Sequence, residues 1–252
     1  MSLSRRNLLG GAALAGASSI VASSALAQDA ASPVAVQTGP PGYAIVRVRA
    51  LPTAELNNAV YPNVMHHYLP LIEATPGYGG YLFAFHDDEP GSSITITPTT
   101  DEAAGVKSDE AATGYIAGLD PRFTPETPLA QRGPLRAWGL TDRSPSELSP
   151  FLHGYKVTVR DRQSAPGADV EAIVAQVNDE LLPMLMGMDG FILYAWVQTE
   201  TGRTAINIWE TAEQMAAGDQ AVAEYVAQNT VSTTVGDPIV NNGTIGYTSG
   251  IV

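Results

Sequence analysis

The sequence predicts an α+β protein made of two consecutive units that share the element order β-α-β-β-α-β. The first sign is a repeated glycine motif, since residues 77–83 are matched 113 positions later by residues 190–196, each behind a Leu-Pro pair. The second is a strand-like alternation at the start of each copy, and the third is a helix-start signal near the end of each copy. Self-similarity at a fixed offset indicates an internal duplication.

The opening strands are expected at 43–49 and 155–160, where apolar and polar residues alternate. Val46 falls on Val159 at the same offset of 113. A helix follows in each copy, because apolar residues recur at helical spacing over 60–71 and 173–184. The prolines inside these patterns are expected to kink or shorten the helices, and they are Pro62, Pro70 and Pro183.

The glycine motif then opens a second strand, and a turn leads into a third. The third strands, 94–97 and 206–209, align if the second copy has a turn one residue shorter. A threonine followed three residues later by Glu or Gln comes next in each copy, at Thr99 and Thr211. This spacing is typical of a capping box and predicts two helix starts. Fourth strands are expected at 135–140 and 244–249.

These elements give a first unit over 43–140, a Ser- and Pro-rich linker over 141–150 and a second unit over 151–252. The order in each unit is ferredoxin-like. Such a unit covers one face of its sheet with helices and leaves the other face in need of a partner. We therefore expect the two units to pack sheet to sheet as an intramolecular α/β barrel.

The N-terminus predicts export. Arg5 and Arg6 precede an Ala- and Gly-rich apolar run that ends in Ala25-Leu26-Ala27. This order resembles a cleavable twin-arginine signal peptide over 1–27, followed by a lead segment over 28–42. A general secretory signal and a retained membrane anchor are the alternatives. A periplasmic or secreted protein with no membrane contact after cleavage is expected.

Composition restricts the function classes. The chain carries 26 acidic against 13 basic residues, which argues against nucleic acid as a partner. It has no cysteine, so disulfides, thiolate metal sites and a cysteine nucleophile are excluded. Glycine-rich nucleotide motifs and a serine nucleophile elbow are absent as well, which disfavours nucleotide-dependent chemistry and serine hydrolysis.

Two segments carry a family resemblance: Gly190-Phe191 entering a strand, and 206–210 entering a capped helix. They resemble the antibiotic-biosynthesis-monooxygenase type of dimeric α/β barrel, here as two tandem copies. The resemblance implies cofactor-independent oxygenases, haem-degrading relatives, isomerases, lyases or members without known activity. It also implies that a small molecule lies between the sheet and its covering elements.

Alternation along the strands sorts the candidate binding residues. The isoleucines at 94, 96, 206 and 208 are expected under the helices, which turns Asn207 and Trp209 toward the barrel interior. The expected substrate-binding residues are Arg47, Arg160, Tyr81, Tyr194, Trp196 and Trp209. The alternative is structural: packing for Tyr81, Tyr194 and Trp209, and salt bridges at the barrel seam for the two arginines.

The candidate catalytic residues are Asn207, His67 and His86. A buried amide in an isoleucine-rich strand must find partners, and a substrate carbonyl or phenol is one candidate beside a neighbouring backbone group. His67 or His86 could serve as a general base, with surface exposure as the alternative. No metal is expected, because the histidine spacing matches no standard metal motif. The resemblance implies that no cofactor is needed. Haem ligation by His153 is a weaker alternative.

The sequence therefore predicts an exported, cofactor-independent oxygenase, lyase or isomerase. Its ligand would be a small aromatic or hydrophobic molecule bound in the barrel. A non-catalytic periplasmic ligand-binding or scaffold protein is the alternative, followed by a haem-binding protein. Association as a homodimer is a further possibility.

Overall fold

The computed structural model describes residues 40–125, 129–229 and 234–251, all within the compact unit Val34–Val252. The expected signal peptide over 1–27 and most of the lead segment over 28–42 lie outside the described residues. Within these ranges, no helix is long and apolar enough to cross a membrane.

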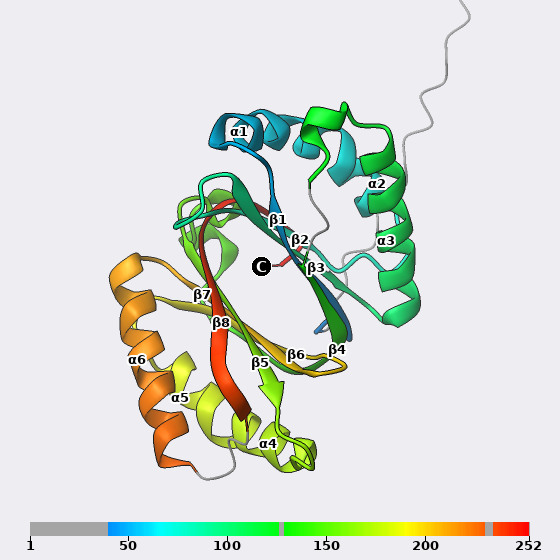
Figure 1. Cartoon of the computed structure of the whole chain (residues 1–252). Coiled ribbons are helices and arrows are strands. Elements are labelled where there is room, and N and C mark those ends of the chain that lie inside the picture. Colours follow the sequence, from blue (N-terminus) through cyan, green and yellow to red (C-terminus); the bar gives the residue numbers. More distant parts are fainter. Residues whose placement is uncertain (1–39, 126–128, 230–233, 252) are drawn as a thin grey trace, which may run out of the picture. The chain divides into compact units, whose positions relative to one another are not determined.

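Eight antiparallel strands close into one barrel in the order β1-β3-β2-β8-β5-β7-β6-β4, which confirms the expected α+β barrel (Figure 1). The strands are β1 (Tyr43–Ala50), β2 (Tyr81–His86), β3 (Ser92–Thr99), β4 (Leu129–Leu140), β5 (Lys156–Ser164), β6 (Phe191–Gln198), β7 (Gly202–Trp209) and β8 (Thr234–Ser249). We call β1–β4 with their helices the first unit, and β5–β8 with theirs the second unit.

The fourth strand of each unit closes the barrel by pairing with both units. Residues 129–134 of β4 pair with β1, and residues 135–140 pair with β6 of the second unit. Strand β8 pairs with β5 along its first part and with β2 of the first unit through residues 243–249. The sequence prediction found only the parts that cross between units. The earlier parts contain Pro134 and Pro238, which argue against a strand when no partner is known.

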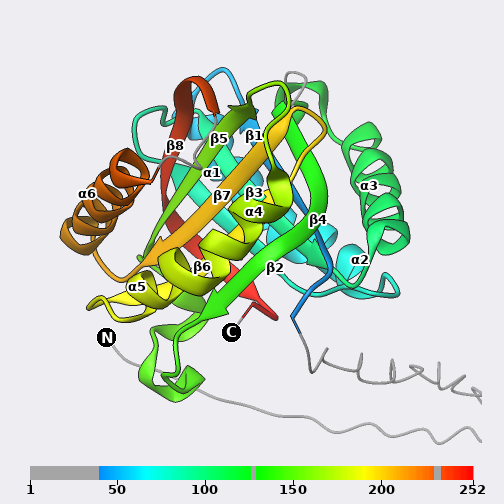
Figure 2. The ribbon, with the colours of Figure 1, turned by 90° about the horizontal axis from the view of Figure 1, so that it is seen from below.

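The helices lie outside the barrel, with those of the first unit on one side and those of the second on the other (Figures 1 and 2). The first unit contains α1 (Ala54–Asn63), a π-helical turn η1 (Val64–Tyr68), α2 (Leu69–Glu73) and α3 (Glu102–Ala117). The second contains α4 (Val170–Gln176), the π-helical turn η5 (Val177–Leu181), α5 (Leu182–Met186) and α6 (Ala212–Gln228). Short 3₁₀ turns are η2 (Pro121–Phe123), η3 (Pro145–Glu147) and η4 (Pro150–Leu152).

The prolines do not break the helices as sharply as expected. A π-helical turn stands directly before the segment that contains Pro70 or Pro183, and the N–H of Leu69 donates to the carbonyl of Val64. The N–H of Leu182 donates to Val177 in the same way. The wider turn accommodates a residue that lacks a backbone donor and would crowd the preceding carbonyl. Both units therefore have a π-helical turn directly before the proline-containing segment.

The strand registers correct the expected alignment of the two units. Val46 pairs with Ile96, and its counterpart Val159 pairs with Ile206, so the third strands correspond at an offset of 110. The intervening turn is therefore three residues shorter in the second unit, because 113 − 110 = 3, and not one residue shorter. Asn207 thus corresponds to Thr97.

The same shift explains the helix starts. The capping box at Thr211 is confirmed, with Gln214 completing it. The one expected at Thr99 is wrong, because the N-cap of α3 is Asp101, whose carboxylate accepts from the N–H of Ala104 at 2.9 Å. Asp101 is 110 residues before Thr211, so both caps occupy equivalent places.

The face assignment of the third strands was also wrong. Apolar side chains from both units fill the barrel interior, and they include the four isoleucines that had been placed under the helices. Asn207 and Trp209 lie on the other face, against the helices. A polar side chain inside a closed barrel would find neither water nor a free hydrogen-bond partner, so branched aliphatic side chains fill this space. The cavity that the described residues leave inside is only about 10 Å³, too small for a ligand.

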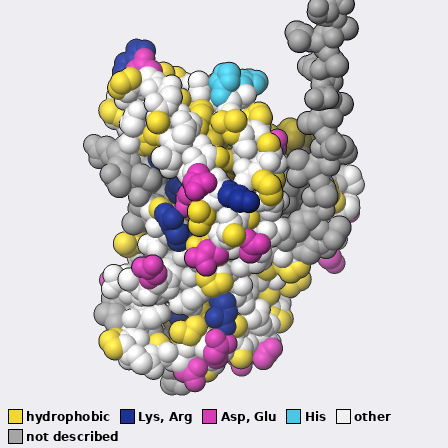
Figure 3. All heavy atoms as spheres, turned by 90° about the vertical axis from the view of Figure 1, so that its right-hand side faces the viewer, with side chains coloured by type: hydrophobic (Ala, Val, Ile, Leu, Met, Phe, Trp, Pro, Cys, Tyr) yellow, Lys and Arg dark blue, Asp and Glu magenta, His cyan; other side chains and the backbone are white. Residues whose placement is uncertain are grey.

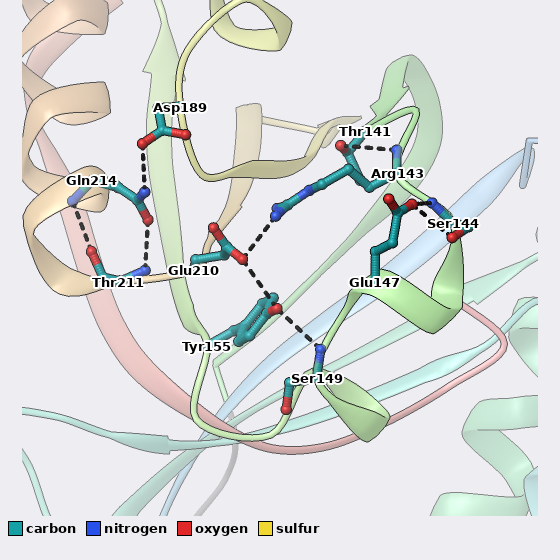
Figure 4. Close-up of polar contacts among 10 residues, drawn as sticks. All are labelled: Thr141, Arg143, Ser144, Glu147, Ser149, Tyr155, Asp189, Glu210, Thr211 and Gln214. Atoms are coloured by element: carbon teal, nitrogen blue, oxygen red, sulfur yellow. Dashed lines mark hydrogen bonds and ion pairs between the residues drawn. The ribbon is translucent and has the colours of Figure 1, made fainter.

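The linker is anchored to the second unit (Figure 4). Arg143 donates to the carboxylate of Glu210 at 2.8 Å, and the hydroxyl of Tyr155 donates to the same carboxylate at 3.3 Å. The N–H of Ser149 donates to the Tyr155 hydroxyl oxygen at 3.1 Å. Leu148 is buried in the barrel core. Residues expected to form only a linker therefore pack against the barrel.

The repeated glycine motif is framework. Gly77 and Gly190 have φ of 83° and 74°, in the left-handed region that favours glycine. A Cβ on Gly190 would lie 2.1 Å from the side chain of Gln214, and one on Gly77 would lie 2.5 Å from the Cβ of Ala104. The motif lets the strand entrance approach the start of the long helix closely.

Candidate functional site

Arg47 and Arg160 hold the long helices against the sheet. Arg47 forms an ion pair with Asp109 of α3, and Arg160 forms one with Asp219 of α6. The pairs are equivalent, because the arginines are 113 residues apart and the aspartates 110 apart. The two arginines expected to bind substrate therefore already have carboxylate partners, at the sheet–helix contact and not at a barrel seam.

A cavity of about 60 Å³ lies on the outer face of β5, β6 and β7, beneath the helices of the second unit. We call it the second-unit cavity. Four of the residues expected to form the site line it, namely Arg160, Tyr194, Trp196 and Asn207. Aliphatic side chains and five further polar or aromatic ones complete the wall, the latter being Arg162, Gln176, Arg203, Tyr225 and Asn229.

Trp209 is 1% exposed and packs beside this cavity instead of lining it. Its ring meets that of Phe191 edge to face, with centroids 5.6 Å apart. The structural interpretation therefore fits Trp209 better than a binding role.

Some of the buried polar atoms without a hydrogen-bond partner lie at the second-unit cavity. Within the described residues, Oδ1 of Asn207 and Nε1 of Trp196 are buried and have no hydrogen-bond partner. Leaving such a group unpaired costs roughly 1–3 kcal/mol. The guanidinium of Arg203 lies over the Trp196 ring, 5.6 Å from its centroid. Unpaired groups of this kind, next to aromatic surface, are free to form hydrogen bonds with a ligand or with water.

Burial governs ionisation in this cavity. It raises the pKa of Tyr194 to about 12, and Arg203, Arg160 and Arg162 oppose the rise only in part. Burial also lowers the pKa of Arg203 and of Arg162, the latter further through repulsion from Arg160. Tyr194 is therefore a hydrogen-bond donor at neutral pH and not a base. No histidine, aspartate or glutamate is among the described residues that line the cavity.

The equivalent place in the first unit is smaller and more aromatic. This first-unit cavity, of about 30 Å³, is lined by Arg49, Tyr68, Tyr81, Phe83, Tyr115 and Phe123 among others. Tyr68 stands where the second unit has Leu181, and its ring contacts those of Tyr81 and Tyr115 at centroid distances of 5.8 and 5.1 Å. Tyr81 therefore belongs to a different cavity from Tyr194, and aromatic rings fill most of the space there.

The structure does not bring the histidines to either cavity. His67 is exposed on η1, and exposed histidines are visible at the surface in Figure 3. His86 is buried at the end of β2, where Nδ1 accepts from the N–H groups of Asp88 and Glu89 and Nε2 lies 3.3 Å from Oδ1 of Asn241. His153, considered above as a haem ligand, is exposed and lines neither cavity. In the described ranges, no group of three or more potential metal ligands occurs.

Sequence reasoning missed Arg162, Arg203 and Tyr225. Arg162 could have been found, because it stands two residues after Arg160 on the same strand face. Arg203 and Tyr225 carried no signal of their own. Their place in the cavity follows from the 110-residue offset, which depends on the register between β5 and β7.

Comparison with known proteins agrees with this architecture. No protein-family model matches the chain, and no curated protein matches it. Among solved structures, a protein of Fusobacterium nucleatum provisionally named a monooxygenase has a TM-score of 0.63 at 11% identity, covering 84% of this chain and 95% of that one. An anthrone oxidase-like protein has a TM-score of 0.59 at 14% identity, covering 83% and 93%. A protein provisionally named a chlorite dismutase has a TM-score of 0.56 at 11% identity, covering 82% and 95%.

These likenesses, all at low identity, establish the fold alone. The chain is a ferredoxin-like α/β barrel of the architecture seen in these monooxygenase-named and chlorite-dismutase-named structures.

Proposed function

We propose that this protein is a cofactor-independent, monooxygenase-like enzyme that oxidises a small phenolic molecule in the second-unit cavity. One observation carries the proposal: the second-unit cavity combines aromatic walls with the unpaired polar atoms of Asn207 and Trp196. The monooxygenase-named and anthrone oxidase-like neighbours support the choice of oxygenation over lysis or isomerisation. The small cavity favours a single ring over a fused ring system.

A balanced reaction of this class is the oxygenation of a hydroquinone to a hydroxyquinone and water by one dioxygen. One oxygen atom enters the ring, the other leaves as water, and the aromatic ring supplies the electrons. The protein's part is to orient the ring and to exclude water from the reaction. The Asn207 amide would hold a substrate hydroxyl, and the Trp196 N–H would hold the oxygen that becomes a carbonyl.

The test uses 1,4-dihydroxybenzene, with the mature protein under ¹⁸O₂ and mass spectrometry of the product. We expect one labelled oxygen in hydroxybenzoquinone, formed faster than without protein and without added metal or flavin. Asn207→Val should lower kcat/KM by roughly tenfold, the value of one lost hydrogen bond in the transition state. Thr97→Val, the equivalent change in the first unit, should leave kcat/KM unchanged. Equal rates in the Asn207→Val and Thr97→Val variants would refute the role of the second-unit cavity.

A non-catalytic ligand-binding protein is the second candidate, favoured by the absence of a carboxylate or imidazole among the described lining residues. It predicts that phenols bind with no oxygen consumed above the rate without protein. An oxygen electrode on the same samples separates the two candidates.

Export is part of the proposal and rests on the N-terminal pattern around Arg5 and Arg6. We expect the full chain to reach the periplasm and to begin at Gln28 after cleavage. Replacing both arginines by lysine should keep the uncleaved chain in the cytoplasm, as fractionation and N-terminal sequencing would show. Unchanged export of that variant would favour a general secretory signal.

A further inference from the structure

We propose that the second-unit cavity binds its phenolic substrate as the phenolate, with Arg162 and Arg203 stabilising the anionic oxygen in place of a protein base. The inference rests on the proposed function and specifies the ionised form in which the substrate binds. Four observations support it: the charges, their arrangement, the contrast between the units and the lack of a base.

The cavity gathers cations in an acidic protein. Three arginines line it, although the chain has 13 basic against 26 acidic residues. Asp219 neutralises Arg160. Neither Arg162 nor Arg203 has a carboxylate within ion-pair distance among the described residues. Two acidic groups lie nearby: Asp237 acts on Arg162 from a longer distance, and Glu180 accepts from the Tyr225 hydroxyl at 2.9 Å.

The two unpaired arginines face each other. Arg162 on β5 is directly opposite Arg203 on β7 in the strand register, so the side chains leave the sheet side by side. Like charges directly opposite each other destabilise a sheet. An anion between the two guanidiniums would turn this repulsion into attraction. The Arg203 guanidinium over the Trp196 ring is already oriented, so little freedom is lost when the anion binds.

The first unit lacks this pair. Arg49 corresponds to Arg162, but the residue opposite it is Ser93. The first-unit cavity therefore carries one unpaired arginine where the second-unit cavity carries two. Because both units fold in the same way and the first has Ser93 at this position, the fold itself does not require an arginine at 203.

The described lining offers no base for a phenol. Tyr194 and Tyr225 are protonated at neutral pH, because the pKa of each is raised to about 12, and the other polar lining groups are arginines, amides and the Trp196 indole. Two adjacent cations favour the charged form of a bound acid and so lower its pKa. The phenol O–H bond then breaks with its proton passing to water at the open side of the cavity. The electron pair stays on the oxygen, ready for transfer to dioxygen.

The experiment follows the ionisation of 4-nitrophenol, whose phenolate absorbs visible light, in the presence of excess mature protein. The pH at which half of the bound ligand is ionised is compared with that of the free ligand. We expect a decrease of at least one pH unit, a tenfold shift of the ionisation equilibrium. Arg203→Gln should remove most of it, and Arg162→Gln provides a second variant if the first fails to fold. The matched control is Arg49→Gln, which should leave the shift unchanged.

The outcomes separate the two proposals. Bound 4-nitrophenol that ionises at the same pH as free ligand or higher overturns the inference, and so does a lack of binding at millimolar concentration. If 1,4-dihydroxybenzene is still oxygenated in either case, the proposed function stands without phenolate binding. If the shift is present and depends on Arg203 while no oxygen is consumed, phenolate binding stands and the proposed enzymatic function fails.

Discussion

Replacing Trp209 by alanine should lower the free energy of unfolding by about 3–5 kcal/mol, the usual cost of removing a buried tryptophan. The side chain is 1% exposed and packs against Phe191 in the apolar cluster beneath the helices of the second unit. In a domain of this size the melting temperature should fall by roughly 10 °C. Chemical denaturation of the mature protein would measure the change.

Gly218 supplies the control for this prediction. A Cβ at Gly218 of α6 would lie 2.2 Å from the Trp209 ring, so Gly218→Ala should cost about 1–3 kcal/mol through overpacking. In the Trp209→Ala background the same change should cost little, because the ring that it strikes is gone. Additive effects of the two substitutions would mean that Trp209 does not support α6 as the structure shows.

The sequence predicted the elements of the fold well, because these elements follow from local periodicity and local motifs. The two glycine motifs, the alternation around Val46 and Val159 and the capping box at Thr211 all report local geometry, and all match the structure. What failed depended on pairing between strands. The offset of the third strands was two residues in error, since a slip of two preserves the alternation of faces and leaves no local trace.

The candidate site was predicted in part. Arg160, Tyr194, Trp196 and Asn207 do share one cavity, because alternation correctly placed them on one face. Which face they share was wrong, because both faces of a barrel covered by helices are buried and the sequence gives no sign of which is closed. Arg203 was missed for a related reason: its partner Arg162 is 41 residues away and meets it only through the β5–β7 register.

The second large effect is expected at the ion pair between Arg160 and Asp219, which connects β5 with α6. Arg160→Met should lower the free energy of unfolding by about 2–3 kcal/mol, since a charged hydrogen bond is lost and Asp219 keeps no ion-pair partner among the described residues. The cost should fall short of that for a fully buried pair, because the Asp219 side chain is 29% exposed and water can solvate it.

The first unit provides a matched comparison. Asp109 also pairs with Arg132 at 2.7 Å, so it keeps a partner after Arg47→Met. Asp109→Asn leaves two arginines unpaired, whereas Asp219→Asn leaves one. We therefore expect Asp109→Asn to be more destabilising than Asp219→Asn. Double-mutant cycles measured by denaturation should give a coupling of about 1–2 kcal/mol for each Arg–Asp pair.

The same cycles distinguish a structural arginine from a binding one. If Arg160 mainly holds α6 against the sheet, the Arg160→Met variant should lose stability. The ionisation shift of bound 4-nitrophenol should then remain close to its original value. Arg203→Gln should do the reverse, because Arg203 has no carboxylate partner in the described part of the chain. If Arg160→Met abolished the shift and the Arg160–Asp219 coupling were zero, the roles of the two arginines would have to be exchanged.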